Sequence, residues 1–381
     1  MKIFIHAVSA HDMGGAARHL AGFLPALVRM GQDHEYLLYV NDRLPLDSLP
    51  SNYQVSRLPV QSGLQRFWWD QFTLPHLIKK ERADLIIALL SFGSTRPPCP
   101  QITFLRNPIY CPHYMINLSV KQRLDVLLRR YFLYKTLRAS HLIIAPSAAT
   151  RDITRDVHPD LPLDRFRVLP HAFNRELFLS SEDLPLSVSN LLPEERSSDT
   201  IRLLYVGHIL PYKGFRTVLE AIKHLADQGI NFKLYLTIAR ENWPSGFDQW
   251  VAEVSRLQLN DHVEILGRIP SKAIGNLYRR CDILWFPSLC ETFGWPIIEA
   301  MSCSLPIVAS DTPLNREMAD EAALYYPPFD AFAASQAITR LTLDSAERRH
   351  LGEIGQKRAD AHIQWDQYVQ TVLNYCAEVI S

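Results

Sequence analysis

The chain has 381 residues, of which 47% are hydrophobic and 21% are charged, as is ordinary for a soluble globular enzyme. Lysine plus arginine equals aspartate plus glutamate at 40 each, so the net charge gives no indication of a nucleic-acid-binding protein. At roughly 150 residues per domain, the length predicts two domains.

The first residues, "MKIFIHAVSAHD", form too short an apolar run for a signal peptide and predict a first strand instead. No stretch reaches the roughly 18 apolar residues that a membrane-spanning helix needs. The six cysteines are scattered without the paired spacing of a metal site, and we expect no bound metal. We therefore expect a cytoplasmic protein, with peripheral contact with the inner face of the membrane as an open alternative.

Short apolar runs alternate with longer amphipathic segments along the whole chain. The first half contains six predicted strands: Lys2–Val8, Tyr36–Asn41, Asp84–Leu90, Gln101–Leu105, His141–Ala145 and Phe166–Pro170. The second half contains six more: Ile201–Val206, Phe232–Ile238, Val263–Leu266, Asp282–Phe286, Pro306–Ala309 and Ala323–Tyr326. Near-continuous apolar strands suit parallel sheets covered by helices on both faces. The two sets therefore predict an α/β protein with two doubly wound domains.

The segment from Ser180 to Thr200 is rich in serine, proline and acidic residues and shows little helix or strand pattern. It predicts a linker at 181–199 between an N-terminal domain of residues 1–180 and a C-terminal domain of residues 200–363. Beyond Asp330 only helical stretches follow.

A first candidate ligand loop, "SAHDMGGAARHL", follows the first predicted strand. Gly14 and Gly15 let the backbone turn sharply and approach a ligand, and the following helix points its amides at the same place. The loop lacks the Gly-x-Gly-x-x-Gly spacing of a dinucleotide site, which disfavours a dehydrogenase. A plain strand-to-helix turn is the alternative.

A second candidate loop, "YVGHILPYKGF", follows the first strand of the second half. Lys213 lies just before a predicted helix, where its ammonium group could neutralise a diphosphate. An exposed loop lysine without a ligand is the alternative.

The third candidate is "SLCETFGWPIIEAMSCSLPIVASDTP", in which a helix is predicted to begin at Trp295. Backbone amides from Thr292 onward lie at the start of this helix and favour phosphate oxygens. Glu299 is expected in the first helical turn, where an acid stabilises the helix dipole, whereas Glu291 lies in the preceding loop. Two carboxylates that flank a phosphate-binding loop can accept hydrogen bonds from the hydroxyls of a sugar nucleotide.

This third stretch resembles the Glu-x7-Glu signature of glycosyltransferase family 4, retaining enzymes of the GT-B fold. The resemblance extends over nearly the whole chain, in the family's order: "MGGAARHL" resembles its N-terminal Gly-Gly loop, "APSAATRDI" its Ser motif, "VLPHAFNRELF" the segment before its interdomain linker and "YVGHILPYKGF" its diphosphate loop. It implies two Rossmann-like domains facing a central cleft, with the C-terminal helix, 364–381, returning to the N-terminal domain.

The resemblance also implies residue roles. Glu291 would contact hydroxyls of the donor sugar, Glu299 would hold the nucleotide ribose, and Lys213 would neutralise the diphosphate. The residues implied in donor binding are His208, Lys213, Thr292, Phe293, Gly294 and Glu299 from the C-terminal domain, with Gly14 and Gly15 from the N-terminal domain.

Three places depart from the family pattern, and one of them, Ser304 where a glycine is common, is expected to be tolerated. His208 stands where most members have arginine, so that a fixed charge becomes a titratable one. Arg106-Asn107 stands where a His-Asp pair is usual, and we expect either Arg106 or His113 to take the catalytic role of that histidine.

The implied function is transfer of a sugar, with retention, from a nucleotide-sugar donor to a glycan or lipid-linked acceptor, in the biosynthesis of a cell-surface polysaccharide or lipopolysaccharide. No cofactor or metal is implied, because protein cations and amides stabilise the departing diphosphate. The alternatives are a catalytically silent nucleotide-sugar-binding partner subunit and a nucleotide-sugar epimerase or phosphorylase on the same fold.

The stretch Lys121–Ser140 carries six basic residues with interleaved aromatics on the acceptor side. We favour a helix whose basic face is solvated and whose opposite, apolar stripe packs on the core. The stripe is formed by Leu124, Leu127, Leu128 and Tyr131. The alternative is a helix that rests on an anionic membrane near a lipid-linked acceptor. For Arg66–Ile78, "RFWWDQFTLPHLI", we likewise favour packing against the core.

Overall fold

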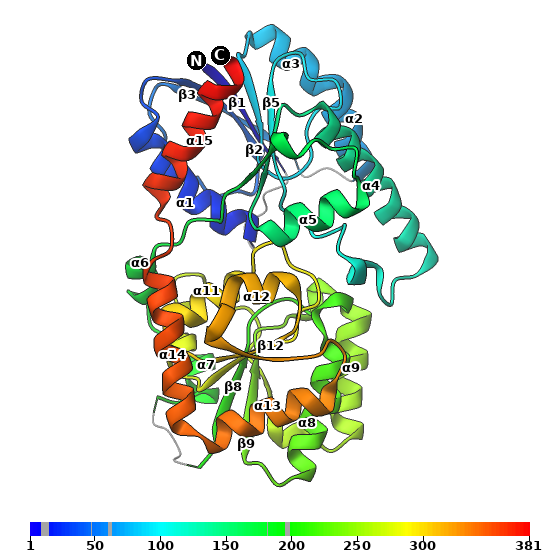
Figure 1. Cartoon of the computed structure of the whole chain (residues 1–381), viewed down its shortest axis with the longest axis vertical. Coiled ribbons are helices and arrows are strands. Elements are labelled where there is room, and N and C mark those ends of the chain that lie inside the picture. Colours follow the sequence, from blue (N-terminus) through cyan, green and yellow to red (C-terminus); the bar gives the residue numbers. More distant parts are fainter. Residues whose placement is uncertain (9–14, 47, 60–62, 181, 195–198) are drawn as a thin grey trace. The chain divides into compact units, whose positions relative to one another are not determined.

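A computed structural model describes the chain except for residues 9–14, 47, 60–62, 181 and 195–198 (Figure 1). The chain divides into two compact units. The first comprises residues 1–111, 119–173 and 363–381, and the second comprises residues 112–118 and 174–362. Each unit is an α/β structure built around one parallel sheet.

The first unit contains a seven-stranded sheet in the order β3-β2-β1-β4-β5-β6-β7. Its strands are β1 (Lys2–Ala7), β2 (Glu35–Asn41), β3 (Tyr53–Leu58), β4 (Leu85–Ala88), β5 (Gln101–Phe104), β6 (Leu142–Ala145) and β7 (Phe166–Val168). Its helices are α1 (Gly15–Met30), α2 (Gly63–Trp68), the π-helix η1 (Trp69–Thr73), α3 (Leu74–Glu81), α4 (Val120–Ala139), α5 (Ala148–Val157) and α15 (Trp365–Ile380). The strand order reverses between β1 and β4, which is where doubly wound sheets place ligands.

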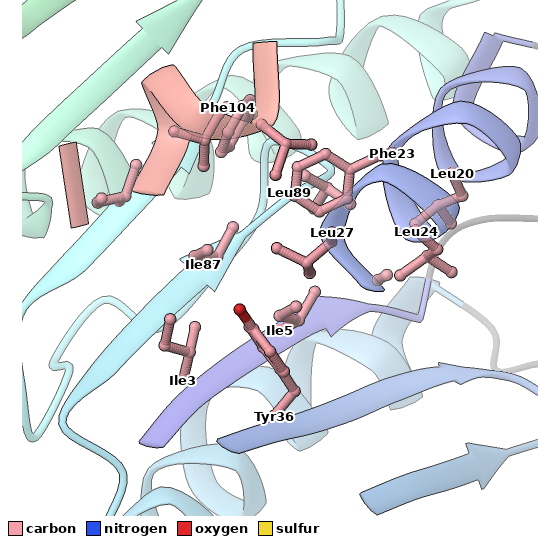
Figure 2. Close-up of a cluster of buried hydrophobic side chains, with 14 of the residues drawn as sticks. Ile3, Ile5, Leu20, Phe23, Leu24, Leu27, Tyr36, Ile87, Leu89 and Phe104 are labelled. Atoms are coloured by element: carbon pink, nitrogen blue, oxygen red, sulfur yellow. The ribbon is translucent and has the colours of Figure 1, made fainter. Parts of the chain in front are cut away.

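The core of the first unit forms because the middle strands are apolar on both faces and α1 carries an apolar stripe (Figure 2). On α1, Leu20, Phe23, Leu24 and Leu27 are buried at helical spacing and pack over the strands. Figure 2 shows this stripe facing the side chains of β1, β2 and β4.

The C-terminal helix α15 packs on α1 and belongs to the first unit. Val369, Val372 and Cys376 enter the same core. Gly22 is required on α1, because a Cβ there would lie 2.0 Å from Cε2 of Trp365. The predicted return of the C-terminal helix to the N-terminal domain is confirmed.

A buried polar cluster joins α1 to α15. His19 is fully buried, and its Nε2 is 3.1 Å from the hydroxyl of Tyr368. Burial lowers the pKa of His19 well below its ordinary value, with Arg106 and His171 as smaller causes of the same sign. His19 is therefore neutral in the folded protein at neutral pH.

This burial predicts a pH dependence of stability. The unfolded chain protonates His19 near pH 6.5 while the folded chain does not, so stability is full above that pH and falls as the pH drops through and below it. The slope from one such group is at most about 1.4 kcal/mol per pH unit. Urea unfolding of the wild type and His19→Gln between pH 7.5 and about 5 should show a shallower slope in the variant. Equal slopes for the wild type and His19→Gln would contradict this account.

The second unit contains a six-stranded sheet in the order β10-β9-β8-β11-β12-β13. Its strands are β8 (Ile201–Tyr205), β9 (Phe232–Leu236), β10 (Val263–Ile265), β11 (Ile283–Phe286), β12 (Ile307–Ser310) and β13 (Ala323–Tyr326). Its helices are α6 (Arg175–Leu179), α7 (Leu186–Leu191), α8 (Phe215–Asp227), α9 (Pro244–Arg256), α10 (Ile274–Arg279), α11 (Trp295–Ser302), α12 (Pro313–Ala319), α13 (Ala331–Leu343) and α14 (Ser345–Asp360). Strand order reverses between β8 and β11.

The prediction of two doubly wound parallel sheets is confirmed, and each of the predicted strands is present within a few residues of its expected bounds. Two elements were not predicted. Strand β3 lies at the edge of the first sheet, and helix α7 lies inside the segment predicted to be an irregular linker. Val188 of α7 is buried, so this short helix packs rather than standing free.

The predicted core stripe of α4 is wrong. Its four members are exposed to solvent: Leu124 by 62%, Leu127 by 49%, Leu128 by 48% and Tyr131 by 53%. The helix packs instead through Val126, Leu133, Thr136 and Leu137. A helical repeat of apolar residues shows that one face is apolar but does not show what covers it.

The packing predicted for Arg66–Ile78 is only partly confirmed. Leu74 and Ile78 are buried, whereas Trp68 and Phe72 are 59% and 58% exposed and stack on one another with ring centroids 4.8 Å apart.

None of the helices in the described parts of the chain combines the length and the hydropathy needed to cross a membrane.

Candidate functional site

The candidate site lies in the second unit, at the carboxyl ends of the neighbouring strands β8 and β11. These strands are paired in parallel, with Leu203 opposite Ile283 and Leu204 opposite Leu284. The segment after β8 leads through the short helix η4 (Pro211–Lys213) into α8, and the segment after β11 leads into α11. The two predicted donor loops therefore emerge side by side at the point where strand order reverses.

Gly214 lets these two segments approach one another closely. It has φ +75°, and a Cβ there would lie 2.3 Å from the carbonyl oxygen of Pro287. The Leu289 amide also donates to the Tyr212 carbonyl over 2.9 Å. A side chain at position 214 would force η4 away from the loop after β11.

We expect Gly214→Ala to disturb the site by this steric route. It should lower stability by about 1–3 kcal/mol, because it combines a strained φ with a backbone clash, and it should also reduce any activity that depends on the neighbouring Lys213. Gly229→Ala is the matched control, since Gly229 has φ +70° with nothing within 4 Å of its added Cβ. Urea unfolding should show a larger loss of stability in Gly214→Ala than in Gly229→Ala. Equal losses would mean that only the backbone angle matters.

Lys213 and Glu291 meet at the centre of this site. The Lys213 ammonium donates to Oε1 of Glu291, and the two side chains are only 15% and 17% exposed. The Tyr212 ring lies under the ammonium, 5.6 Å away. A largely buried ion pair at the ends of two adjacent strands places one cation and one anion where a ligand with both phosphate and hydroxyl groups could bind.

A buried tyrosine, Tyr205, lies near the pair. Burial raises the pKa of the Tyr205 phenol well above its ordinary value, with the Glu291 carboxylate and Tyr212 as smaller causes. Tyr205 remains protonated and donates to the His208 carbonyl over 3.0 Å. The backbone at His208 is thus fixed beside the site, and its side chain is half-buried.

The start of α11 is formed by Gly294, which has φ +77° and precedes the first helical residue, Trp295. The predicted start of this helix is confirmed. Thr292 is half-buried, whereas Phe293 and Gly294 are buried. The Phe293 ring packs edge-on against the Trp295 ring, with ring centroids 5.1 Å apart. The Phe293 side chain therefore anchors the loop, and the polar groups that this residue can offer a ligand are those of its backbone.

Glu299 is more deeply buried than its predicted role at a helix terminus requires. It is 2% exposed, and the Tyr278 hydroxyl donates to its Oε2 over 2.7 Å. Because α11 begins at Trp295, Glu299 lies in the second turn, and the predicted placement in the first turn is wrong. Stabilisation of the helix dipole therefore does not account for this acid.

The loop after β11 is also braced from α12. Asn315 is fully buried, and its Nδ2 donates to the carbonyls of Ser288 and Ser310 over 3.2 and 2.9 Å. Ser310 Oγ donates to the same Ser288 carbonyl over 2.6 Å. Sequence analysis missed Asn315 and Tyr278, because no motif connects them with the two carboxylates, and it gave no role to Tyr212, which lies in the quoted loop before Lys213.

Four predicted site residues belong to neither the loop after β8 nor the loop after β11, and one of them, His113, lies in a short helix that contacts η4. Gly14 lies outside the described residues, and Gly15 is the exposed first residue of α1 in the first unit. Arg106 follows β5 in the first unit, where its guanidinium lies 5.8 Å from the Phe104 ring and bonds to the Tyr368 hydroxyl. His113 belongs to the second unit, where its ring meets that of Phe329 edge-on at 5.2 Å.

Comparison with known sequence families gives two matches. Residues 13–177 match the family described as Glycosyltransferase Family 4, and residues 192–358 match Glycosyl transferases group 1. Together the two matched ranges extend over most of the chain.

Individual relatives match over shorter ranges. The chain is 27% identical over 252 residues to O-antigen chain mannosyltransferase B of Escherichia coli. The aligned region covers 64% of this chain and 62% of that protein. It is 29% identical over 176 residues to O-antigen chain mannosyltransferase RfbU of Salmonella typhimurium, which covers 46% of each. The chain thus spans about half to three-fifths of the length of these relatives.

The fold matches solved structures along its whole length. Anabaena Alr3699/HepE, solved in complex with UDP-glucose, superposes with a TM-score of 0.72 at 17% identity, covering 99% of both chains. The predicted GT-B fold is confirmed.

Proposed function

Because the chain belongs to the family 4 glycosyltransferases, we propose that it transfers a sugar from a nucleotide-sugar donor to a glycan acceptor during synthesis of a cell-surface polysaccharide such as lipopolysaccharide. The two relatives that act in O-antigen synthesis support this class of acceptor. The observation that carries the proposal is the Lys213–Glu291 pair at the carboxyl ends of β8 and β11.

We assign the parts of the donor to this site as follows. The Lys213 ammonium and the amides at the start of α11 bind the diphosphate, because both present positive charge to its oxygens. Glu291 releases part of its bond with Lys213 and accepts hydrogen bonds from hydroxyls of the sugar. Glu299 accepts hydrogen bonds from the ribose, with its second oxygen held by Tyr278.

The proposed reaction proceeds with retention of configuration at the sugar, as the family resemblance implies. The bond between the anomeric carbon and the diphosphate oxygen breaks, an acceptor hydroxyl oxygen forms the new bond to the anomeric carbon, and the hydroxyl proton passes to the departing diphosphate. Lys213 and the α11 amides stabilise the charge that develops on the departing diphosphate. We propose a lipid-linked glycan as acceptor and the cytoplasm as location.

Arg106 and His113 remain the candidates for the catalytic role of the family histidine. They lie in different units, and each has a defined neighbour: Tyr368 for Arg106 and Phe329 for His113. Substitution by alanine of the residue that takes the catalytic role should lower the turnover of the enzyme without a matching loss of donor affinity.

Turnover should not depend on a divalent metal ion, because this proposal gives Lys213 and backbone amides the task of stabilising the leaving group. Treatment of the purified enzyme with EDTA should leave its rate unchanged, measured as nucleoside diphosphate released per minute. Activity that disappears on chelation and returns with added Mg²⁺ or Mn²⁺ would refute the assignment of leaving-group stabilisation to Lys213.

The donor class can be identified by a thermal-shift panel of free nucleoside diphosphates and nucleotide sugars. A ligand at about 100 times its dissociation constant adds roughly 2.7 kcal/mol of stability, which raises the melting temperature by several degrees. The panel should include UDP-glucose and GDP-mannose, the former because HepE binds it and the latter because the O-antigen relatives transfer mannose. If no nucleotide stabilises the protein, the proposed donor site is wrong.

A further inference from the structure

A short segment of the second unit, residues 112–118, comes from the first half of the chain. The stretches on both sides of it along the chain belong to the first unit, whereas the segment itself belongs to the second. It contains the 3-10 helix η2 (Pro112–Met115), and the Ile116 amide donates to the His113 carbonyl over 3.2 Å at the end of this helix. Because η2 contacts η4, the helix that carries Lys213, the segment lies beside the candidate donor site.

The contact between η2 and η4 is an aromatic stack. The Tyr114 ring of η2 lies over the Tyr212 ring of η4, with ring centroids 4.8 Å apart and ring planes 23° from parallel. This geometry is within the range that offset-stacked aromatic pairs prefer. Both side chains are half-buried, so part of each ring is removed from water by the contact.

The same Tyr212 ring lies under the Lys213 ammonium, 5.6 Å from its centroid. Burial raises the pKa of the Tyr212 phenol, with Tyr114 and the Glu291 carboxylate as smaller causes, so the ring is neutral and its face attracts a cation. A lysine ammonium is a point charge on a flexible stem, and the groups around it decide where it rests. The Leu289 amide fixes the backbone of Tyr212, whereas the stack on Tyr114 restrains its ring.

A second aromatic contact holds η2 at the residue before Tyr114. The His113 ring meets the Phe329 ring edge-on, with centroids 5.2 Å apart and planes at 84°. Phe329 follows β13 and has φ +69°, in the left-handed region that a bulky side chain rarely adopts. Residues remain in such a strained conformation only where their surroundings fix them, and they are frequent at functional sites. Two successive residues of η2 are therefore held by segments that follow different strands of the second sheet.

We propose that Tyr114 is a positioning residue of the donor site, which holds the Lys213 ammonium in place for the diphosphate through its stack on Tyr212. The proposal rests on the donor site proposed above and adds a residue to it. Tyr114 acts through its neighbour and need not touch the ligand. A nucleobase inserted between the two tyrosine rings is excluded, because two stacking gaps need about 7 Å between the rings and the centroids are 4.8 Å apart.

The test is a double-mutant cycle on the whole protein. The probe is the free nucleoside diphosphate that the thermal-shift panel selects, UDP or GDP, and calorimetry at fixed ionic strength gives its dissociation constant. Tyr114→Ala should weaken its binding by about tenfold, but by less than about twofold when Lys213→Ala is already present, because the ammonium that Tyr114 positions is then absent. Tyr114→Leu keeps bulk without an aromatic ring and should behave like Tyr114→Ala. Tyr114→Phe keeps the ring and should stay within about twofold of the wild type.

Two controls separate positioning from a general loss of structure. Uridine or guanosine has no phosphate, so Tyr114→Ala should leave its affinity within about twofold of the wild type. Phe72→Ala removes one ring of the exposed stacked pair in the first unit and should change neither affinity.

Three results would overturn the positioning role: equal losses for nucleoside and diphosphate, a loss in Tyr114→Phe as large as in Tyr114→Ala, and the same loss with and without Lys213. A diphosphate affinity that Lys213→Ala lowers and Tyr114→Ala and Tyr114→Leu leave unchanged would overturn this role alone and keep the donor site. An unchanged affinity in Lys213→Ala would overturn the donor site, and the positioning role with it.

Discussion

Replacing Glu291 with alanine is expected to reduce sugar transfer by about 100-fold or more while leaving affinity for free nucleoside diphosphate unchanged or higher. Glu291 is bonded to Lys213, so removing the carboxylate frees the ammonium group for phosphate. The lost partner is the sugar, which free nucleoside diphosphate lacks. Initial rates at saturating donor and calorimetric dissociation constants for the diphosphate measure the two effects separately.

Lys213→Ala should have the complementary effect and weaken binding of the diphosphate and the donor alike, because the phosphates lose their cation. The exposed i,i+4 pair of Lys223 and Asp227 in α8 supplies a matched control, and Lys223→Ala should change neither affinity nor rate. If Glu291→Ala weakens free diphosphate as much as it weakens the donor, Glu291 does not bind the sugar.

Replacing Glu299 with glutamine is expected to weaken both the nucleotide sugar and the free nucleoside diphosphate, because both carry the ribose. A hydrogen bond to a charged group contributes about 1.5–3 kcal/mol, which corresponds to a loss of affinity of roughly tenfold to 150-fold. Glutamine keeps the volume of this buried side chain, so folding should survive. Urea unfolding should verify this before dissociation constants are compared.

Tyr278→Phe separates ribose binding from packing. It removes the hydroxyl that donates to Glu299 Oε2 but leaves the carboxylate charge in place. We expect a smaller loss of nucleotide affinity than in Glu299→Gln, of the same sign for donor and diphosphate. Unchanged diphosphate affinity in Glu299→Gln would remove the ribose assignment, whatever Tyr278→Phe does.

The sequence predicts the sheets of this protein well because most strands are buried on both faces and therefore appear as uninterrupted apolar runs. Strand β3 escapes prediction because it lies at the edge of its sheet, and of its six residues only Tyr53 is buried. Its alternation of polar and apolar residues is too weak to distinguish a strand from a loop. The short helix α7 escapes because its stretch is dominated by residues typical of loops.

The candidate site shows a similar limit. Spacing alone places Glu291 and Glu299 near the start of one helix, but Lys213 and Glu291 are 78 residues apart and are brought together only by the pairing of β8 with β11. The partner of Glu299 is Tyr278, which belongs to the preceding helix α10 and carries no motif. Sequence patterns identify the functional groups; tertiary structure decides which of them meet.

Helix α4 shows the limit for surfaces. Its apolar repeat is visible in the sequence, but the same repeat serves a helix that packs on a core and a helix that faces solvent. The structure distinguishes the two through burial, since Val126, Leu133 and Leu137 are covered and the stripe at Leu124 and Leu128 is not.

The central claim, that this chain is a sugar transferase whose donor site lies at the ends of β8 and β11, is tested most directly by turnover of a nucleotide sugar. The purified protein is incubated with the donor that the thermal-shift panel selects and with membrane lipid extract as acceptor, and released nucleoside diphosphate is measured together with sugar incorporated into the lipid fraction. We predict equal amounts of both from the wild type, with a loss of about 100-fold in Glu291→Ala and none in Lys223→Ala. Donor binding without release of diphosphate by the wild type would contradict the claim and would identify the chain as a silent nucleotide-sugar-binding protein.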